Sequence, residues 1–205
     1  MEENEMQDKP LNEQESLEII TRMIRNTQKK LERGAGGPFL IWGYATIITT
    51  LTVWIVIRLT LNPQFNYLWF MIPVIGSIFM FYRKKQPKGV RTYIDKVITY
   101  IWIVLGGTGF LLSMMSIFSV MWNFPILFVI IIIMGMGSVL TGLVIDFKPA
   151  VIGGIIGLLI SIPHFLISWY AFDVRMFTFI LAFISMYIIP GHILNYKMKK
   201  ACSKN

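Results

Sequence analysis

The sequence predicts an all-α, polytopic integral membrane protein: a bundle of six transmembrane helices preceded by one amphipathic helix. Six long apolar runs fill the chain between Phe39 and Tyr196, and no charged residue lies inside any of them. Each run approaches the ~20 residues that a helix needs to cross ~30 Å of hydrocarbon. Only 15% of the residues are charged, whereas soluble domains have about 25%.

The apolar runs divide the chain into a single membrane domain with short flanks. We place the six spans at residues 39–57, 65–82, 97–117, 122–145, 149–172 and 176–196. The remainder is an arm at residues 1–38, one loop between the second and third spans, and a basic tail at 197–205. Too little chain is left for a second folded domain.

Residues 12–33 of the arm have the pattern of an amphipathic helix. Asn12 and Glu15 have the spacing of a capping box at its start. Apolar residues then recur on one helical face, as expected for a helix with a single apolar stripe. The residues of this stripe are Leu17, Ile20, Ile24 and Leu31.

Two helix-disfavouring residue types follow the amphipathic helix at the end of the arm. Gly34, Gly36, Gly37 and Pro38 stand directly before the first span. Glycine and proline at such a position are typical of a helix end, so we predict a hinge that separates the amphipathic helix from the first span. The apolar stripe could then lie on anionic headgroups at the bilayer surface. Alternatively, it could dock on a cytoplasmic protein, a second copy or the mouth of the bundle, or stay free in solvent.

Basic residues indicate which way the bundle is inserted. Of the 19 Lys and Arg residues, 17 fall in the arm, the loop after the second span, the turn after the fourth span and the tail. Only Arg58 and Arg175 fall on the other side. Because Lys and Arg are retained in cytoplasmic loops, we predict a protein of the cytoplasmic (inner) membrane with both termini in the cytoplasm.

The same distribution indicates which binding partner the basic residues attract. The net charge is +8, and residues 83–96 alone contribute +5 beside the membrane. Basic clusters next to a span are expected partners of anionic lipid headgroups, so we expect no nucleic-acid binding.

Small residues recur every four positions in the fourth and fifth spans, which only Asp146, Phe147 and Lys148 separate. This spacing lets helix backbones approach closely in lipid. We therefore predict a tightly packed antiparallel hairpin; the same residues could also form a dimer seam or a backbone-lined path for a small solute. The predicted packing residues are Gly137, Ser138, Thr141, Gly142, Gly153, Gly157 and Ser161.

His164 is the candidate polar residue inside the membrane. It follows Pro163 and lies 15 residues beyond Pro149, or ~22 Å along the helix. It is either a hydrogen-bonded packing residue or a group that faces a cavity. No span contains Asp, Glu, Lys or Arg, which argues against ion-coupled transport. We find no catalytic, cofactor or metal motif, and Cys202 is the single cysteine.

Two segments carry a resemblance to a known family. The run ESLEIITRMIRNTQKKLERG leads to FLIWGY, and PGHILN lies in the last span. Together they resemble a family of uncharacterised bacterial membrane proteins with a cytoplasmic ESLxII-type helix and an FLxWG first span. The resemblance implies a six-helix inner-membrane protein and names no activity.

The sequence therefore favours a non-catalytic membrane protein that signals or forms a scaffold through its cytoplasmic amphipathic helix. The alternative is a small channel or carrier for a neutral or lipid-like solute, built on the hairpin of the fourth and fifth spans and His164.

Overall fold

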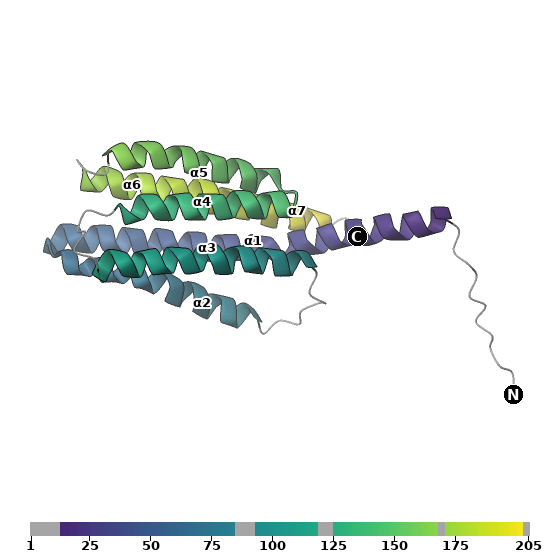
Figure 1. Cartoon of the computed structure of the whole chain (residues 1–205), viewed down its shortest axis with the longest axis horizontal. Helices are drawn as coiled ribbons and strands as arrows, with labels where there is room; N and C mark the ends of the chain where they lie inside the picture. The colour runs from purple at the N-terminus through teal and green to yellow at the C-terminus, as the bar shows by residue number, and fades with distance from the viewer. Residues whose placement is uncertain (1–12, 85–92, 119–124, 168–170, 203–205) are drawn as a thin grey trace, which may run out of the picture.

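The computed structural model describes residues 13–84, 93–118, 125–167 and 171–202, and these residues form helices and no strands. Six of the helical segments are long and apolar enough to cross a membrane, which confirms the predicted fold class. They run side by side along one axis (Figure 1). The spans are Gly36–Thr60, Pro63–Tyr82, Tyr93–Ser116, Ile126–Val144, Lys148–Leu166 and Phe172–Lys197.

The first, third, fourth and fifth spans are each formed by one α-helix. These helices are α1 (Glu13–Thr60), α3 (Tyr93–Phe118), α4 (Ile126–Val144) and α5 (Lys148–Ile167). Several predicted features lie outside the described residues: the cap at Asn12, residues 122–124 and 168–170 of two spans, most of the basic loop, and the end of the tail.

The second span changes helix type partway along. It begins as the 3₁₀-helix η1 (Pro63–Phe70) and continues as α2 (Met71–Lys84). The Asn62 side chain caps η1, because its Oδ1 accepts a hydrogen bond of 2.9 Å from the Gln64 amide. Pro73 lies in the first turn of α2 and has no backbone N–H to donate.

The sixth span contains a π-helical turn between two α-helices. Its segments are α6 (Phe172–Phe183), η2 (Ile184–Ile188) and α7 (Ile189–Cys202). Pro190 follows the π turn, so the carbonyl of Met186 lacks the donor that an ordinary residue at position 190 would supply. A π turn is a known way for a helix to absorb such a defect.

The predicted hinge at Gly34–Pro38 is wrong, because α1 continues through it as one helix of 48 residues. Gly36 of this segment and Gly191 of α7 instead permit a close crossing of α1 and α7. A Cβ atom on Gly36 would clash with the side chain of Asn195, and one on Gly191 would lie 2.8 Å from Leu40. Packing against α7 therefore stabilises helical backbone where the local sequence alone indicates a break.

The amphipathic segment is consequently the outer part of α1 and extends beyond the bundle along its long axis (Figure 1). Residues 13–35 are helical and precede the apolar span, which gives about 34 Å of helix before the span begins. The side chains described in its first turns are exposed, with Leu17 at 64%. This segment does not lie across the end of the bundle.

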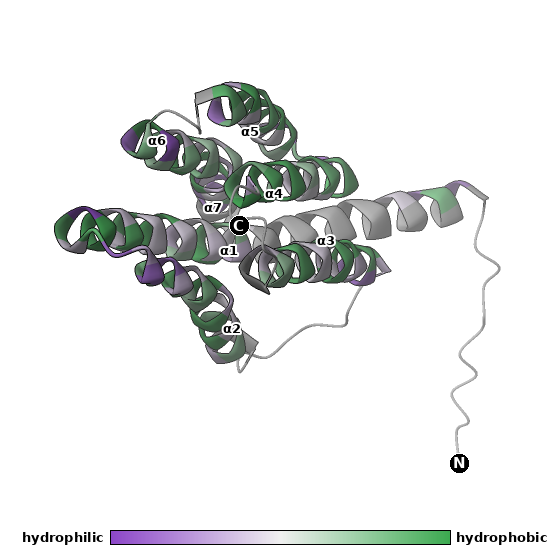
Figure 2. Ribbon diagram, turned by 60° about the vertical axis from the view of Figure 1, so that its left-hand side comes forward, coloured by the Kyte–Doolittle hydropathy of each residue, from purple (hydrophilic) through white to green (hydrophobic). Residues whose placement is uncertain are grey.

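The core lies between α1, α4, α5 and the sixth span. In the windows that define these four spans, 33% to 44% of the residues are buried, against 6% in the second and third spans. Aromatic rings of the sixth span form its centre, with ring centroids 4.8 Å apart for Phe179 and Phe183 and 5.5 Å apart for Phe183 and Tyr187. Figure 2 shows α2 and α3 at the periphery.

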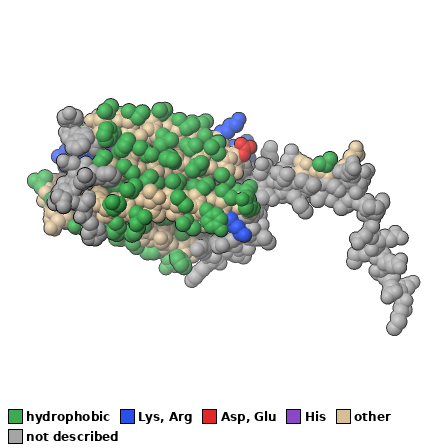
Figure 3. Space-filling model, viewed as in Figure 1, with side chains coloured by type: hydrophobic (Ala, Val, Ile, Leu, Met, Phe, Trp, Pro, Cys, Tyr) green, Lys and Arg blue, Asp and Glu red, His purple; other side chains and the backbone are tan. Residues whose placement is uncertain are grey.

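The outer surface of the bundle is apolar. Large exposed hydrophobic residues occur on every span, and Figure 3 shows them covering the face of the bundle, with charged side chains near its ends. Water-soluble monomers rarely expose continuous apolar surface on this scale. Lipid is the medium that suits this surface, so the chain is a multi-pass membrane protein.

Candidate functional site

The seven predicted packing residues are all buried, but they belong to several different contacts. Gly142 faces α5, where a Cβ atom would lie 2.7 Å from the Val151 amide nitrogen. The α4–α5 crossing also uses Gly135 and Gly154, since a Cβ atom on Gly154 would lie 3.0 Å from the Gly135 carbonyl oxygen. The predicted antiparallel hairpin is present, and Asp146 makes its turn with a positive φ of 53°.

Gly137 and Thr141 face α3 instead of α5. A Cβ atom on Gly137 would lie 2.9 Å from the Trp102 ring. The Trp102 indole Nε1–H donates a 3.2 Å hydrogen bond to the Thr141 hydroxyl oxygen, and that hydroxyl donates to the Gly137 carbonyl at 2.7 Å. These contacts attach the peripheral helix α3 to the core.

Gly153 and Gly157 face the sixth span. A Cβ atom on Gly153 would clash with the Ser185 carbonyl, and one on Gly157 would clash with the Met186 side chain. The fifth span can therefore approach the π turn η2 only because glycine occupies these two positions.

Ser138 of α4 joins three helical segments near the contact between α5 and η2. Its hydroxyl oxygen lies 3.1 Å from the carbonyl oxygen of Ala150 in α5 and 3.1 Å from that of Met186 in η2. The Met186 carbonyl is the one that Pro190 leaves without its α-helical donor. Ser138 is fully buried, so its one hydroxyl hydrogen serves these two carbonyls at a depth where water does not supply a donor.

His164 is a buried hydrogen-bonded residue, with an exposed fraction of only 1%. Its Nδ1 lies 2.8 Å from the hydroxyl oxygen of Thr178 in α6. One turn earlier in α5, the Ser161 hydroxyl donates to the Leu158 carbonyl of its own helix at 2.6 Å. The two side chains therefore differ in role: Ser161 bonds within α5, and His164 links α5 to α6.

The hydrogen bonds of Thr178 indicate the tautomer of His164. The Thr178 hydroxyl donates to the Val174 carbonyl at 2.8 Å, as Thr in a helix often does. Its oxygen is then free to accept from His164 Nδ1–H, so a neutral imidazole keeps an unprotonated Nε2. Within the described residues, His164 Nε2 and Arg175 Nε are buried without a hydrogen-bond partner.

Asp173 forms an interhelical cluster that the sequence analysis did not predict. Its Oδ1 accepts hydrogen bonds of 2.7 Å from Trp54 Nε1 and from Arg58 Nε, and its carboxylate is ion-paired with the Arg58 guanidinium. The cluster links α1 to α6 at the end of the bundle opposite the α1 projection. The sequence places Asp173 and Arg58 at the same predicted end of the bundle. This placement alone does not show that the two side chains are in contact.

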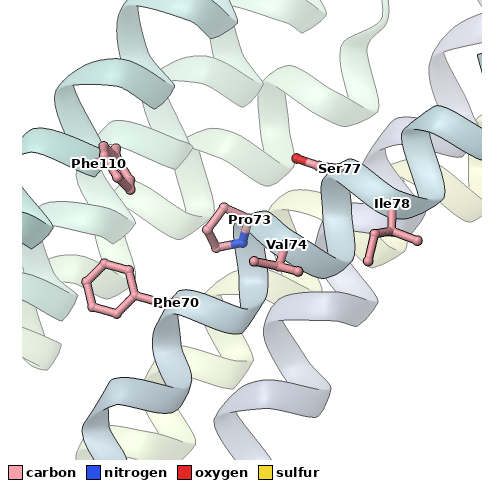
Figure 4. Close-up of a pocket in the computed structure, with 6 residues that line it drawn as sticks. All are labelled: Phe70, Pro73, Val74, Ser77, Ile78 and Phe110. Atoms are coloured by element: carbon pink, nitrogen blue, oxygen red, sulfur yellow. The ribbon is translucent and has the colours of Figure 1, made fainter.

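An apolar groove lies between the second span and α3, and His164 does not line it. It has a volume of about 520 Å³, and Figure 4 shows its lining residues. They are Phe70, Pro73, Val74, Ser77, Ile78 and Phe110. Ser77 supplies the only side-chain hydroxyl among them, so the groove suits an apolar occupant.

The arrangement of titratable residues offers no metal centre within the described part of the chain, since no three His, Cys, Asp or Glu side chains come together there. Comparison of the chain with protein-family models, curated proteins and solved structures found no match in any of the three. The likeness to the six-helix bacterial family stays a prediction.

Proposed function

We propose that this protein is a non-catalytic scaffold or signalling protein of the cytoplasmic membrane, and that the projecting part of α1 is its interaction element. One observation carries this proposal: α1 is continuous from Glu13 to Thr60. A single helix therefore joins the projecting amphipathic segment to the membrane core. A partner bound to the stripe Leu17, Ile20, Ile24 and Leu31 would act directly on the position of α1.

The attachment of α1 along its length supports this role. Near the projection, Gly36 allows contact with α7. Further along the span, a Cβ atom on Gly43 would lie 2.8 Å from the Ile188 side chain of η2. At the far end, Arg58 pairs with Asp173 of α6. A displacement of α1 would therefore be transmitted to the whole sixth span.

The proposed orientation places the projection and both chain ends in the cytoplasm. The projecting end of α1 and the end of α7 lie at the same end of the bundle in Figure 1. Exposed Lys96, Lys148 and Lys197 belong to helix ends on that side, whereas Arg58 belongs to the opposite side. This distribution supports the positive-inside orientation.

The proposal is tested by disrupting the stripe in the full-length protein. We compare Leu17→Ser/Ile20→Ser with Glu18→Ser/Arg22→Ser, which makes the same number of serine substitutions on the opposite helical face. Copurification after crosslinking in cells should show a specific partner, or a second copy, with the wild type and the opposite-face variant. The stripe variant should lose it. Equal recovery with both variants, or no partner with the wild type, would contradict the proposal.

The second candidate is a carrier for a lipid-like solute, and the apolar groove beside α3 is the observation that favours it. Transfer of a fluorescent lipid between the leaflets of proteoliposomes distinguishes the two functions. A scaffold leaves the transfer rate at the value of empty vesicles, whereas a carrier raises it and loses the effect when the groove is filled by Val74→Trp.

A further inference from the structure

A tyrosine and a histidine form a polar pair on the outer surface of the bundle, where α1 crosses α7. The Tyr44 hydroxyl oxygen lies 2.8 Å from His192 Nε2, and the two ring centroids are 6.1 Å apart. Tyr44 is 43% exposed, and His192 is exposed as well. The close contacts at Gly36 and Gly191 hold the two helices together at this crossing, so helix packing brings the two side chains together.

This pair has one hydrogen left for a further acceptor, whichever tautomer His192 adopts. If the Tyr44 hydroxyl donates to Nε2, the neutral ring carries its proton on Nδ1. If Nε2–H donates to the tyrosine oxygen, the tyrosine keeps its hydroxyl hydrogen. Hydrocarbon offers no acceptor for either hydrogen. An oxygen atom of the lipid is therefore the partner that suits an exposed pair at the edge of the membrane.

Polar side chains continue from this pair toward the end of α7. Tyr196 and Lys200 follow His192 at intervals of four residues, so the three residues lie on one side of the helix. Tyr196 is 68% exposed, and Lys200 is also exposed. The sixth span ends at Lys197. His192 thus lies ~7.5 Å of helix before the end of the span, and Lys200 lies ~4.5 Å beyond it.

We call Tyr44, His192, Tyr196 and Lys200 the polar column. Its length fits the interfacial layer of one leaflet. The eight residues from His192 to Lys200 correspond to ~12 Å of helix. A bilayer is about 40–45 Å thick around a hydrocarbon core of ~30 Å, which leaves about 5–8 Å on each side for the headgroups. The polar column therefore extends from headgroup depth into the edge of the hydrocarbon, where the ester groups of a phospholipid lie.

Apolar side chains lie on the deeper side of the polar column. The projecting end of α1 and the end of α7 are at the same end of the bundle (Figure 1). Ile48 is therefore one turn deeper than Tyr44 in α1, and Ile189 is nearly one turn deeper than His192 in α7. Their exposed fractions are 59% and 50%. The surface thus changes from basic to polar to apolar in the same order as a phospholipid does from phosphate to acyl chain.

We propose that the polar column binds one phospholipid of the adjacent leaflet. The phosphate lies at Lys200 and Tyr196, since an ammonium group and a hydroxyl both donate to phosphate oxygens. An ester carbonyl accepts the hydrogen that the Tyr44–His192 pair has left, and the acyl chains cover the apolar surface below. The site uses the membrane part of α1 and not its projecting stripe, so it stands whether or not that stripe binds a partner.

The test measures lipid retention by the full-length protein in neutral detergent by native mass spectrometry. We titrate phosphatidylglycerol and a neutral glycosyl diacylglycerol with identical acyl chains, which has the ester groups but no phosphate. The wild type should retain one phosphatidylglycerol with an apparent Kd about tenfold below that for the glycolipid. Equal retention of the two lipids would show that phosphate is not recognised and would overturn the proposal.

A matched pair of lysine variants locates the phosphate. Lys200→Gln removes the charge from the polar column, whereas Lys148→Gln removes an exposed lysine of α5 at the same end of the bundle. The first should abolish the preference for phosphatidylglycerol, and the second should leave it unchanged. An equal loss in both variants would mean unspecific attraction to a basic surface and would contradict the site.

A second matched pair tests the ester contact. Tyr44→Phe/His192→Phe removes both donors of the pair, and Tyr82→Phe/Tyr100→Phe is the control on two other spans, where the tyrosines are 71% and 64% exposed. Only the first should weaken retention of both lipids, by about fivefold, the effect of one hydrogen bond. Unchanged retention in that variant would refute the contact and with it the site.

A milder variant keeps the test decisive if the double substitution does not fold. Tyr196→Phe changes only one exposed hydroxyl, and it should weaken retention of phosphatidylglycerol while leaving that of the glycolipid unchanged. The same loss for both lipids would contradict a phosphate at this position. A wild-type dimer without a lipid adduct, which Lys200→Gln converts to a monomer, would assign the polar column to a second copy and overturn the proposal.

Discussion

At the residue scale, Ser138 contacts a carbonyl that Pro190 leaves without its α-helical donor in another helix. The proline removes the α-helical donor for the Met186 carbonyl, and the Ser138 hydroxyl lies 3.1 Å from that oxygen. Water cannot replace this donor in the membrane interior. The general requirement that each buried carbonyl has a partner is a physical reason for a hydroxyl side chain at this position.

We predict that Ser138→Ala destabilises the folded bundle by about 1 kcal/mol, the usual size of an interhelical hydrogen bond in a membrane. The measurement is reversible unfolding in mixed detergent micelles. Ser113→Ala is the control, because the Ser113 hydroxyl donates to Gly109 of its own helix at 2.8 Å. In a Pro190→Ala background the cost of Ser138→Ala should fall, since alanine at that position supplies an N–H. An unchanged cost would disconnect the serine from the proline.

A second residue-scale prediction concerns the tautomer of His164. Because Thr178 donates to the Val174 carbonyl, we expect neutral His164 to carry its proton on Nδ1. Nitrogen-15 NMR of the labelled histidines should show a protonated Nδ1 and an unprotonated Nε2 for His164. His192, whose Nε2 lies 2.8 Å from the Tyr44 hydroxyl, provides the internal reference. Thr178→Val should remove the tautomer preference, and a wild-type signal from protonated Nε2 would contradict the assignment.

At the element scale, glycines determine how closely the helices cross. The loss of stability on replacing each glycine by alanine should depend on the atoms that the new Cβ would meet. Gly153 faces the Ser185 backbone carbonyl, which cannot move away. Gly36 faces the end of the Asn195 side chain, which can rotate. Gly106 of α3 has no atom within 4 Å of its Cβ position.

We therefore predict that Gly153→Ala destabilises the bundle most, by about 1–3 kcal/mol, as overpacking does. Gly36→Ala should cost less, and Gly106→Ala should stay within about 0.5 kcal/mol of the wild type. The same unfolding measurement in micelles gives all three values. An equal loss at Gly106 and Gly153 would mean that helix propensity, and not close approach, determines the stability.

The spans could be predicted from the sequence because the length and hydropathy of a transmembrane helix are local properties. The partners of the glycines could not. A four-residue spacing shows that Gly137, Gly153 and Gly157 each lie on a small-residue face, but it does not show that the first faces α3 and the others face η2. The hinge prediction failed for the same reason. The local sequence around Gly36 is typical of a helix end, but Gly36 packs on Asn195 of a helix that is distant in the sequence.

The candidate sites likewise have a part that the sequence predicts and a part that depends on which helices are neighbours. His164 could be recognised as a polar residue inside a span, and burial with a hydrogen bond to Thr178 matches one of its two predicted roles. The Asp173 cluster depends on which helices adjoin at one end of the bundle. The groove depends on α2 and α3 diverging, which a hydropathy pattern does not contain.

At the scale of the whole molecule, the charge asymmetry and the apolar surface describe a bundle with two different ends. Arg58 and Asp173 neutralise each other at one end, while the other end carries the basic helix termini and the α1 projection. An insertion against the positive-inside rule would require translocating most of the 19 Lys and Arg residues. We therefore expect one orientation only.

The single cysteine makes this orientation directly measurable. Cys202 lies at the end of α7, and we predict that a membrane-impermeant maleimide labels it in inverted inner-membrane vesicles but not in intact spheroplasts. Gln64→Cys in a Cys202→Ser background places the only thiol in the turn of η1 at the opposite end, so its labelling should be reversed. Denatured samples control for intrinsic reactivity of each thiol. Labelling of Cys202 from outside intact spheroplasts would reverse the orientation and would move the apolar stripe of α1 away from any cytoplasmic partner.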